Sequence, residues 1–253
     1  MANTKIILPS LSQSETLFGD AILNDPFPPF IGVEASFTED PEEPVDPTYR
    51  VDLHASNFDG TSLISAGTDV EEGWALSDAG SANTVFVDDA NAVGPAMKFD
   101  GASYLTSAEQ PGVASALDVL TTGTYRITSY MSLGGGIGTP RGTFFSYVSA
   151  SRNTNLEISG SSDAVNFRVR VNNSQWVVSQ ATESLVFPQG ELIRVTMDVV
   201  DNVASLFVND LQIAPSVPIP AFTEIDGRVT LGAAYRSSAF NFMEHWLHRV
   251  TID

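Results

Sequence analysis

The chain has 253 residues, no cysteine, and a formal net charge of −19 from 31 acidic and 12 basic side chains. The absence of cysteine excludes a disulfide framework, a thiolate metal site and a cysteine nucleophile. The acidic balance argues against nucleic acid and anionic lipid as partners, since both repel an acidic surface. No apolar run approaches the roughly 18 residues of a spanning helix, so no membrane insertion is expected.

Residues 1–48 differ in composition from the rest of the chain and form the first predicted unit, a proline-rich acidic arm. They hold seven prolines and the acidic run Glu39-Asp40-Pro41-Glu42-Glu43, and proline contributes poorly to a sheet interior. The beginning, MANTKIILPSLSQS, has one lysine and a three-residue apolar run, so we expect no secretory signal. Such an arm is expected to dock on its own domain or on a neighbouring subunit, and a plain linker is an equal alternative. Its apolar anchors are predicted to be Phe18, Ile22, Phe27, Phe30, Ile31 and Phe37.

Residues 49–253 form the second predicted unit, in which the pattern turns to β-structure and stays there. Alternating or short apolar runs bounded by Gly, Asp, Asn and Ser predict about a dozen strands with turns every 8 to 12 residues, which is typical of a sandwich or barrel. The predicted strands after the first, 49–55, include 74–76, 84–87, 96–99, 124–133, 144–148, 155–158, 165–171, 175–178, 228–234 and 246–252. In the strand 165–171, Asn166, Arg168 and Arg170 are expected to face outward.

The clearest prediction is a three-stranded meander over residues 191–213. Ile193, Val195, Met197 and Val199 alternate with polar side chains, as in a half-buried strand. Asp201-Asn202 and Asn209-Asp210 supply two tight turns, because short polar side chains tolerate a left-handed backbone. Asp198 and Asp201 are interpreted as surface and turn residues.

Several motifs resemble the laminin-G-like, concanavalin A-like jelly rolls. The run Gly94-Pro95-Ala96-Met97-Lys98-Phe99-Asp100-Gly101 matches the opening of that family, and Ile193 to Asp198 with Leu206 to Asp210 matches its central hairpin. Leu231-Gly232-Ala233 matches a further strand, and 242–252 matches the closing strand except over 243–250. The resemblance covers roughly residues 50–253 and implies an antiparallel two-sheet jelly-roll sandwich. Such motifs specify a fold far better than a function.

The resemblance also includes enzymes with this fold, but the sequence departs from their catalytic motifs. Retaining glycosidases of the fold carry Glu-x-Asp-x-x-Glu on one strand, but Arg228 and Val229 follow Glu224-Ile225-Asp226 where the second glutamate should be. Arg168-Val169-Arg170 lacks the Gln-x-His of the alginate lyases. His245 and His248, three apart on a strand, would point to opposite faces and so would not share a metal. No Gly-x-Ser-x-Gly elbow positions a serine. We therefore predict a protein that is not an enzyme.

Metal binding is a separate question, because many members of the family bind calcium at one rim through Asp and Asn oxygens. Oxygen donors abound here, but no regular Asp-x-Asp-x-Asp-Gly loop occurs. The prediction is that no cofactor is required, with Ca²⁺ as the alternative; the candidate side chains are Asp59, Asp69, Asp88, Asp89, Asp100, Asp163 and Asp201.

Glycan binding is the function that the aromatic residues on predicted loops favour, because sugar rings stack their C–H faces on aromatic rings. The first candidate is Trp176 beside Asn173, and the weaker ones are Trp74, Tyr235 and Arg141; Trp246 is interpreted as core. For Trp176 a core role is an equal alternative.

The arm, the missing signal and the lone lectin-like domain together favour a phage virion protein. It would be a capsid decoration or tail-associated component, docked through the arm on other virion subunits or on copies of itself, with host cell-surface glycans as expected ligands. The alternative is a carbohydrate-binding module of a bacterial surface or secreted protein, and a polysaccharide-degrading enzyme ranks last.

Overall fold

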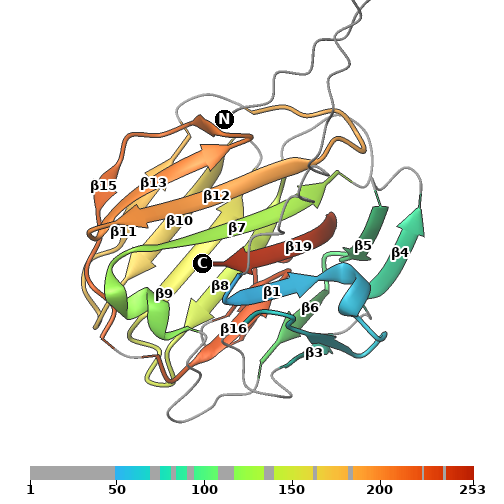
Figure 1. Ribbon diagram of the computed structural model, residues 1–253, viewed down its shortest axis with the longest axis horizontal. Helices are drawn as coiled ribbons and strands as arrows, with labels where there is room; N and C mark the ends of the chain where they lie inside the picture. Colours follow the sequence, from blue (N-terminus) through green and yellow to red (C-terminus); the bar gives the residue numbers. More distant parts are fainter. Residues whose placement is uncertain are drawn as a thin grey trace, which may run out of the picture. The chain divides into compact units, whose positions relative to one another are not determined.

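The computed structural model describes two large antiparallel sheets (Figure 1). It describes residues 49–68, 75–80, 84–89, 94–107, 117–133, 140–161, 164–181, 185–223, 225–235 and 238–253. The predicted arm anchors Phe18, Ile22, Phe27, Phe30, Ile31 and Phe37, and the candidate Trp74, lie outside these residues. No helix of the described part is long and apolar enough to cross a membrane.

The nine-stranded sheet contains both the meander and the last strand of the chain. Its strands run in the order β14 (Leu211–Gln212), β13 (Val203–Val208), β12 (Ile193–Val200), β7 (Tyr125–Ser132), β19 (Trp246–Ile252), β5 (Gly94–Lys98) and β4 (Val85–Asp89). Two further strands complete it, since β1 (Val51–His54) pairs with β19 and β15 (Val217–Pro218) pairs with β13.

The eight-stranded sheet is built mostly from the middle of the chain. Its order is β11 (Val177–Gln180), β10 (Val165–Arg170), β9 (Asn155–Gly160), β8 (Gly142–Val148), β16 (Arg228–Leu231), β6 (Ser103–Thr106), β3 (Ala75–Gly80) and β2 (Ser62–Ile64). A separate two-stranded sheet joins β17 (Ala234–Tyr235) to β18 (Ala239–Phe240). Two short 3₁₀ helices, Ala55–Asn57 and Asp118–Thr122, interrupt the β-structure.

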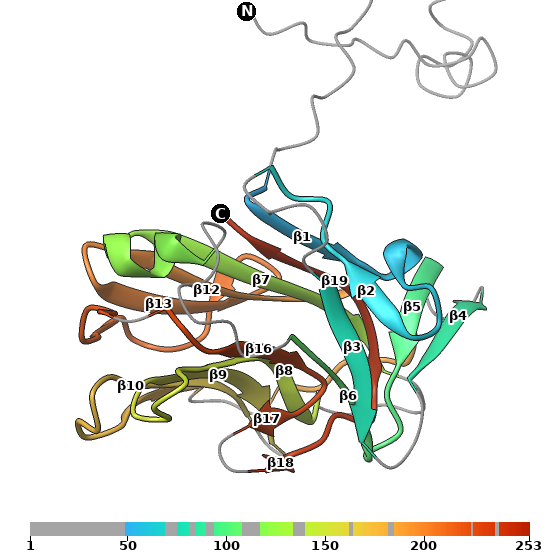
Figure 2. The ribbon, with the colours of Figure 1, turned by 90° about the horizontal axis from the view of Figure 1, so that it is seen from below.

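The two large sheets pack face to face as a sandwich (Figure 2). Alternation along each strand sends one set of side chains between the layers, and Leu53, Ile127, Phe145, Phe167 and Met197 are among those fully buried in one continuous core. The predicted all-β, two-sheet antiparallel sandwich is thereby confirmed.

The meander predicted over 191–213 is present as β12, β13 and β14. Asp201 and Asn202 adopt φ of 51° and 60°, and Asn209 and Asp210 adopt 48° and 67°. Paired left-handed residues are the mark of a two-residue hairpin turn whose twist suits the flanking strands. The residue pattern therefore predicted both turns correctly.

Several details of the sequence reading were wrong. The structure has nineteen strands within its described residues rather than about a dozen, because bridges of two or three residues leave no periodic pattern. The strand expected at 175–178 is β11 at Val177–Gln180, since its register is set by pairing with β10. The strand expected at 228–234 ends at Leu231, where Gly232 turns the chain with φ of 81°. Asn166 does alternate away from the core, but it is buried and accepts a hydrogen bond from Ser159.

Candidate ligand-binding site

A hollow of about 360 Å³ lies on the outer face of the nine-stranded sheet, opposite the core. Strands β7 and β12 form its floor, because their core-facing residues alternate with outward-facing polar ones. Its volume falls at the small end of typical ligand pockets. The lining residues are Tyr49, Arg126, Thr128, Tyr130, Arg194, Thr196, Asp198, Phe207, Asp210 and Asp253.

The floor consists of side-chain pairs that the strand register places opposite one another. Thr196 pairs with Thr128, and their hydroxyl oxygens lie 3.1 Å apart. Asp198 pairs with Arg126, whose Nε and one terminal nitrogen each donate to a different carboxylate oxygen at 3.1 Å. Such two-point contacts between a guanidinium and a carboxylate are directional and hold both side chains in place.

A second ion pair also lines the hollow. Arg194 of β12 donates to the carboxylate of Asp210, which belongs to the turn between β13 and β14. A hydrogen bond holds that turn against β12, because the backbone N–H of Arg194 donates to the Asn209 side-chain oxygen at 2.8 Å. Asp253 is pinned beside Arg126 by two backbone hydrogen bonds of 2.9 and 3.0 Å.

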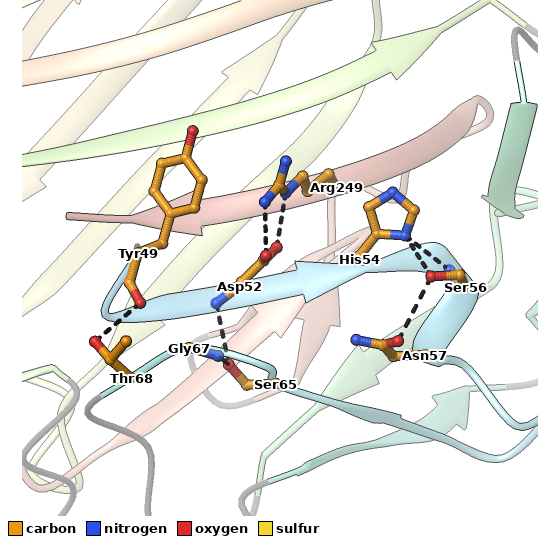
Figure 3. A network of polar contacts seen from close by, with 9 residues as sticks. All are labelled: Tyr49, Asp52, His54, Ser56, Asn57, Ser65, Gly67, Thr68 and Arg249. Carbon is orange, nitrogen blue, oxygen red and sulfur yellow. Dashed lines mark hydrogen bonds and ion pairs between the residues drawn. The ribbon is translucent and has the colours of Figure 1, made fainter. Parts of the chain in front are cut away.

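Aromatic rings border the hollow. Tyr130 extends from β7 and Phe207 from β13, both half-buried. Tyr49 precedes β1, and the Arg249 guanidinium lies 4.9 Å from the centre of its ring. Arg249 is itself held by Asp52, which accepts from its Nε at 2.7 Å and from a terminal nitrogen at 2.6 Å (Figure 3). Burial and then the neighbouring Tyr130 raise the pKa of Tyr49, so its hydroxyl stays protonated at neutral pH.

Sequence reasoning missed this site. The outward positions of β7 and β12 were visible as alternating polar residues, but Asp198 was interpreted only as a surface residue. It is exposed in part, as predicted, yet its partner Arg126 is 72 residues away in the chain. No local pattern reveals that pairing.

Of the predicted glycan-binding residues, the structure brings Trp176 and Asn173 to one loop region between β10 and β11. Trp176 is half-buried, and the Arg170 guanidinium lies 5.0 Å from its ring centre. Asn173 is exposed in a left-handed conformation, and its side-chain amide donates to the Asn153 side chain. Both residues lie outside the hollow, and their glycan-binding role stays a prediction.

Tyr235 and Arg141 belong to other elements. Tyr235 lies in β17, with the Arg228 guanidinium 4.4 Å from its ring centre. Arg141 is an exposed residue that immediately precedes β8. Neither lines the hollow, so the structure does not gather the predicted residues into one site.

The two histidines near the end of the chain do not both lie on one strand, as the sequence analysis had assumed. His245 precedes β19 and is not part of a strand, while His248 lies where the register of β19 against β7 shifts. His248 is buried; its Nδ1 donates to the Pro95 carbonyl at 2.9 Å, and its Nε2 lies 2.8 Å from the Ser132 hydroxyl. This serine–histidine contact has a carbonyl rather than a carboxylate behind the ring, and both side chains are buried. It stabilises the fold and offers no exposed nucleophile.

Among the residues that the structure describes, no group of three or more His, Asp or Glu could hold a metal ion. Asp59 instead caps a turn, accepting from the backbone nitrogens of Ser62 and Thr61 at 2.7 and 2.8 Å, and these hydrogen bonds lower its pKa. Asp100 does the same for Ala102 and Ser103. The candidates Asp69 and Asp163 lie outside the described residues.

Comparisons with known proteins bear on the fold. No protein-family model and no curated protein matches the chain. Among solved structures, the chain is similar to domain 4 of AbnA, an extracellular arabinanase from Geobacillus stearothermophilus, determined in complex with arabinotriose. The match has a TM-score of 0.58 at 12% sequence identity and covers 81% of this chain and 91% of that domain.

The binding region of botulinum neurotoxin is similar as well. A structure of the type C toxin matches with a TM-score of 0.52 at 10% identity over 81% of this chain, and the binding domain of neurotoxin DC in complex with rat synaptotagmin II matches at 0.52 and 11%. This chain spans about half of each of those, 47% and 48%. At such identities the likeness shows the fold alone, an all-β sandwich.

Proposed function

We propose that this protein is a non-enzymatic glycan-binding module and that the hollow on the nine-stranded sheet is its binding site. The observation that carries the proposal is the make-up of the hollow: three aromatic rings stand around a floor of hydroxyl, guanidinium and carboxylate groups. Neighbouring ion pairs and hydrogen bonds fix these groups in position before any ligand arrives.

The chemistry of the lining suits a sugar. Carboxylate oxygens accept hydrogen bonds from sugar hydroxyls, guanidinium groups donate to them, and threonine and tyrosine hydroxyls do both. The edges and faces of Tyr49, Tyr130 and Phe207 supply apolar contact for the C–H groups of a ring. This division between a polar floor and aromatic walls is typical of small-molecule sites.

The known functions of structurally similar proteins support the class of ligand. The structure of the arabinanase domain was determined in complex with arabinotriose. Cell entry of the type C botulinum neurotoxin depends on interaction with two ganglioside molecules. The binding domain of neurotoxin DC was determined in complex with a protein, rat synaptotagmin II, rather than with a glycan. The same fold therefore also serves protein recognition. The lining of the hollow is what favours a glycan for this chain.

The arrangement of carboxylates favours binding over hydrolysis. Glycosidases need a pair of carboxyl groups that flank the scissile bond. In the hollow Asp198 and Asp210 are each occupied by an arginine, and only Asp253 has no ion pair among the described residues.

The test compares two aromatic sites on one chain. The full 253-residue protein would be screened on a glycan array, and the affinity for its best ligand measured by titration calorimetry. Tyr130→Ala should weaken binding at least about tenfold, as expected for loss of a central aromatic contact. Trp176→Ala, at the site predicted from the sequence, serves as the matched control and should leave affinity within about twofold. Loss of binding only in Trp176→Ala would move the site to the β10–β11 loops.

We further propose that the module belongs to a virion, docked through residues 1–48, with a bacterial surface or secreted protein as the alternative. The composition of the arm supports this placement: its prolines and apolar residues suit an extended docking segment. A chain that begins at Tyr49 should keep the glycan affinity of the full protein and fail to join particles. Particle incorporation of the shortened chain would contradict the docking role.

A further inference from the structure

Both guanidinium groups that line the hollow are already paired with carboxylates of the same hollow. Two guanidinium groups, Arg126 and Arg194, face three carboxylates, Asp198, Asp210 and Asp253. Each arginine is committed to one aspartate, Arg126 through two of its nitrogens. The nearby Arg249 is likewise held by both oxygens of Asp52. Within the described lining, carboxylates therefore outnumber guanidinium groups.

An anionic ligand would meet two penalties in this arrangement. To gain an arginine it must displace an aspartate that stays nearby, and it must also approach Asp253. The hydrogen bonds that Arg126 donates to Asp198, together with the negative charges of Asp253 and Asp210, raise the pKa of Arg126, which reflects how negative its surroundings are. The whole chain adds to this, because its net charge of −19 repels anions at longer range.

An uncharged, hydroxyl-rich ligand meets neither penalty. Its hydroxyls can donate to the unused lone pairs of Asp198 and Asp210 without breaking either ion pair, because each carboxylate oxygen accepts more than one hydrogen bond. The Thr128 and Thr196 hydroxyls and the Tyr49 hydroxyl exchange hydrogen bonds without any change of charge.

From this balance of charges we infer that the hollow binds uncharged saccharides and discriminates against glycans that carry carboxylate, sulfate or phosphate groups. The inference rests on the proposed glycan-binding function and names the ligand class of that same site. Discrimination comes from the two internal ion pairs together with the third carboxylate.

The experiment uses an array of matched glycans, each present with and without an acidic group, such as lactose and α2,3-sialyllactose. The full-length protein should bind neutral members at least about tenfold more strongly than their acidic counterparts, and the neutral affinity should change less than about twofold between low and high NaCl, since no net charge is exchanged. Tyr130→Ala should abolish the neutral signals.

Asp210→Asn then tests the mechanism. Asp210 is exposed and occupies a left-handed turn position that asparagine also tolerates, so the variant should fold normally. Removing its charge frees Arg194 and should reduce the preference for neutral glycans by about tenfold or more in the array signal. Asp201→Asn removes one charge from the other turn of the meander, outside the hollow, and should leave the preference unchanged.

The outcomes separate the two claims. Acidic glycans that bind more tightly, through contacts that Tyr130→Ala removes, would overturn the inference and leave the glycan function standing. Neutral binding that survives both Tyr130→Ala and Phe207→Ala would also overturn it, because another surface would then be the site. An array without any bound glycan would refute the proposed function itself, and the inference with it.

Discussion

At the scale of single residues, His248 shows how a polar group is accommodated at the register shift of β19. Its Nδ1–H donates to the Pro95 carbonyl, which can only accept, so Nε2 carries the lone pair and accepts from the Ser132 hydroxyl. A neutral imidazole satisfies both neighbours. A protonated one would lose the bond from Ser132 as it stands and would be a buried charge.

Stability should therefore depend on pH through His248. Burial lowers its pKa in the folded protein from the ordinary 6.5, despite the opposing effect of the Pro95 carbonyl. As pH falls below about 6.5, the unfolded chain binds a proton that the folded chain resists, so the free energy of unfolding decreases. Urea unfolding between about pH 7.5 and 5.5 should show a shallower decrease for His248→Gln than for the wild type.

His245 contributes to the same pH dependence of stability and must be counted when the two unfolding curves are compared. Burial lowers its pKa too, so the wild-type decrease contains the contributions of both histidines and the variant should keep part of it. The many carboxylates contribute equally to both proteins and cancel in the comparison. Parallel curves for wild type and variant would show that His248 plays no part.

Residue-level prediction from sequence succeeded where chemistry is local. Asp201, Asn202, Asn209 and Asp210 were predicted as turns because short polar side chains tolerate positive φ, and all four adopt it. It failed for the hollow, whose central contact joins Arg126 to Asp198 across two strands. That contact depends on sheet register, which neither residue encodes by itself.

At the scale of elements, the strand pair β1 and β19 joins the two ends of the described chain. Val51 pairs with Ile252 and Leu53 with Val250, so both strands bury one face in the core. On the other face the ion pair between Asp52 and Arg249 spans the same two strands (Figure 3). Its side chains are only 18% and 26% exposed, so water screens it less than a typical surface pair.

Asp52→Asn should accordingly destabilise the protein by about 1–3 kcal/mol, because a partly buried guanidinium loses its charged partner. Asp198→Asn breaks a pair of similar geometry with Arg126, but there the side chains are 25% and 57% exposed, and the loss should stay below about 1 kcal/mol. Chemical denaturation of the two variants measures the difference. Equal losses would mean that burial does not set the strength of these pairs.

Element boundaries were predictable where a strand carries its own signal. The last strand was predicted at 246–252 and is found at Trp246–Ile252, since its apolar positions are dense and end with the chain. The strand predicted at 175–178 was displaced by two residues, because Val177–Gln180 takes its limits from its hydrogen bonds to β10. Local composition cannot supply a limit that a neighbour imposes.

At the scale of the whole molecule, the sandwich separates two kinds of surface. Apolar residues fill the space between the sheets, while the outer face of the nine-stranded sheet carries the paired charges of the hollow. The number and spacing of short strands predicted a sandwich or barrel, and the family resemblance implied the two antiparallel sheets that the structure has. It could not predict that β7 would lie between β12 and β19, which is what places Tyr49, Arg126 and Asp198 together.

The net charge of the whole chain determines how the stability of the protein should respond to salt. An excess of 19 negative charges repels itself in the compact state, and the repulsion is relieved on unfolding. Ion pairs such as Arg126–Asp198 oppose this trend, but exposed pairs contribute only about 0–1 kcal/mol each. Raising NaCl from about 20 to about 300 mM shortens the screening length from roughly 20 Å to roughly 6 Å and should weaken the long-range repulsion more than the short contacts.

We therefore expect the unfolding free energy at neutral pH, measured with urea rather than an ionic denaturant, to increase over that range of NaCl. An isosmotic amount of a neutral solute is the control, because it changes water activity without screening charge. A decrease in stability with salt would mean that the ion pairs on the sheet faces outweigh the net charge of the chain. The hollow would then be the first place to look for the extra stabilisation, and Asp198→Asn should remove part of the salt dependence.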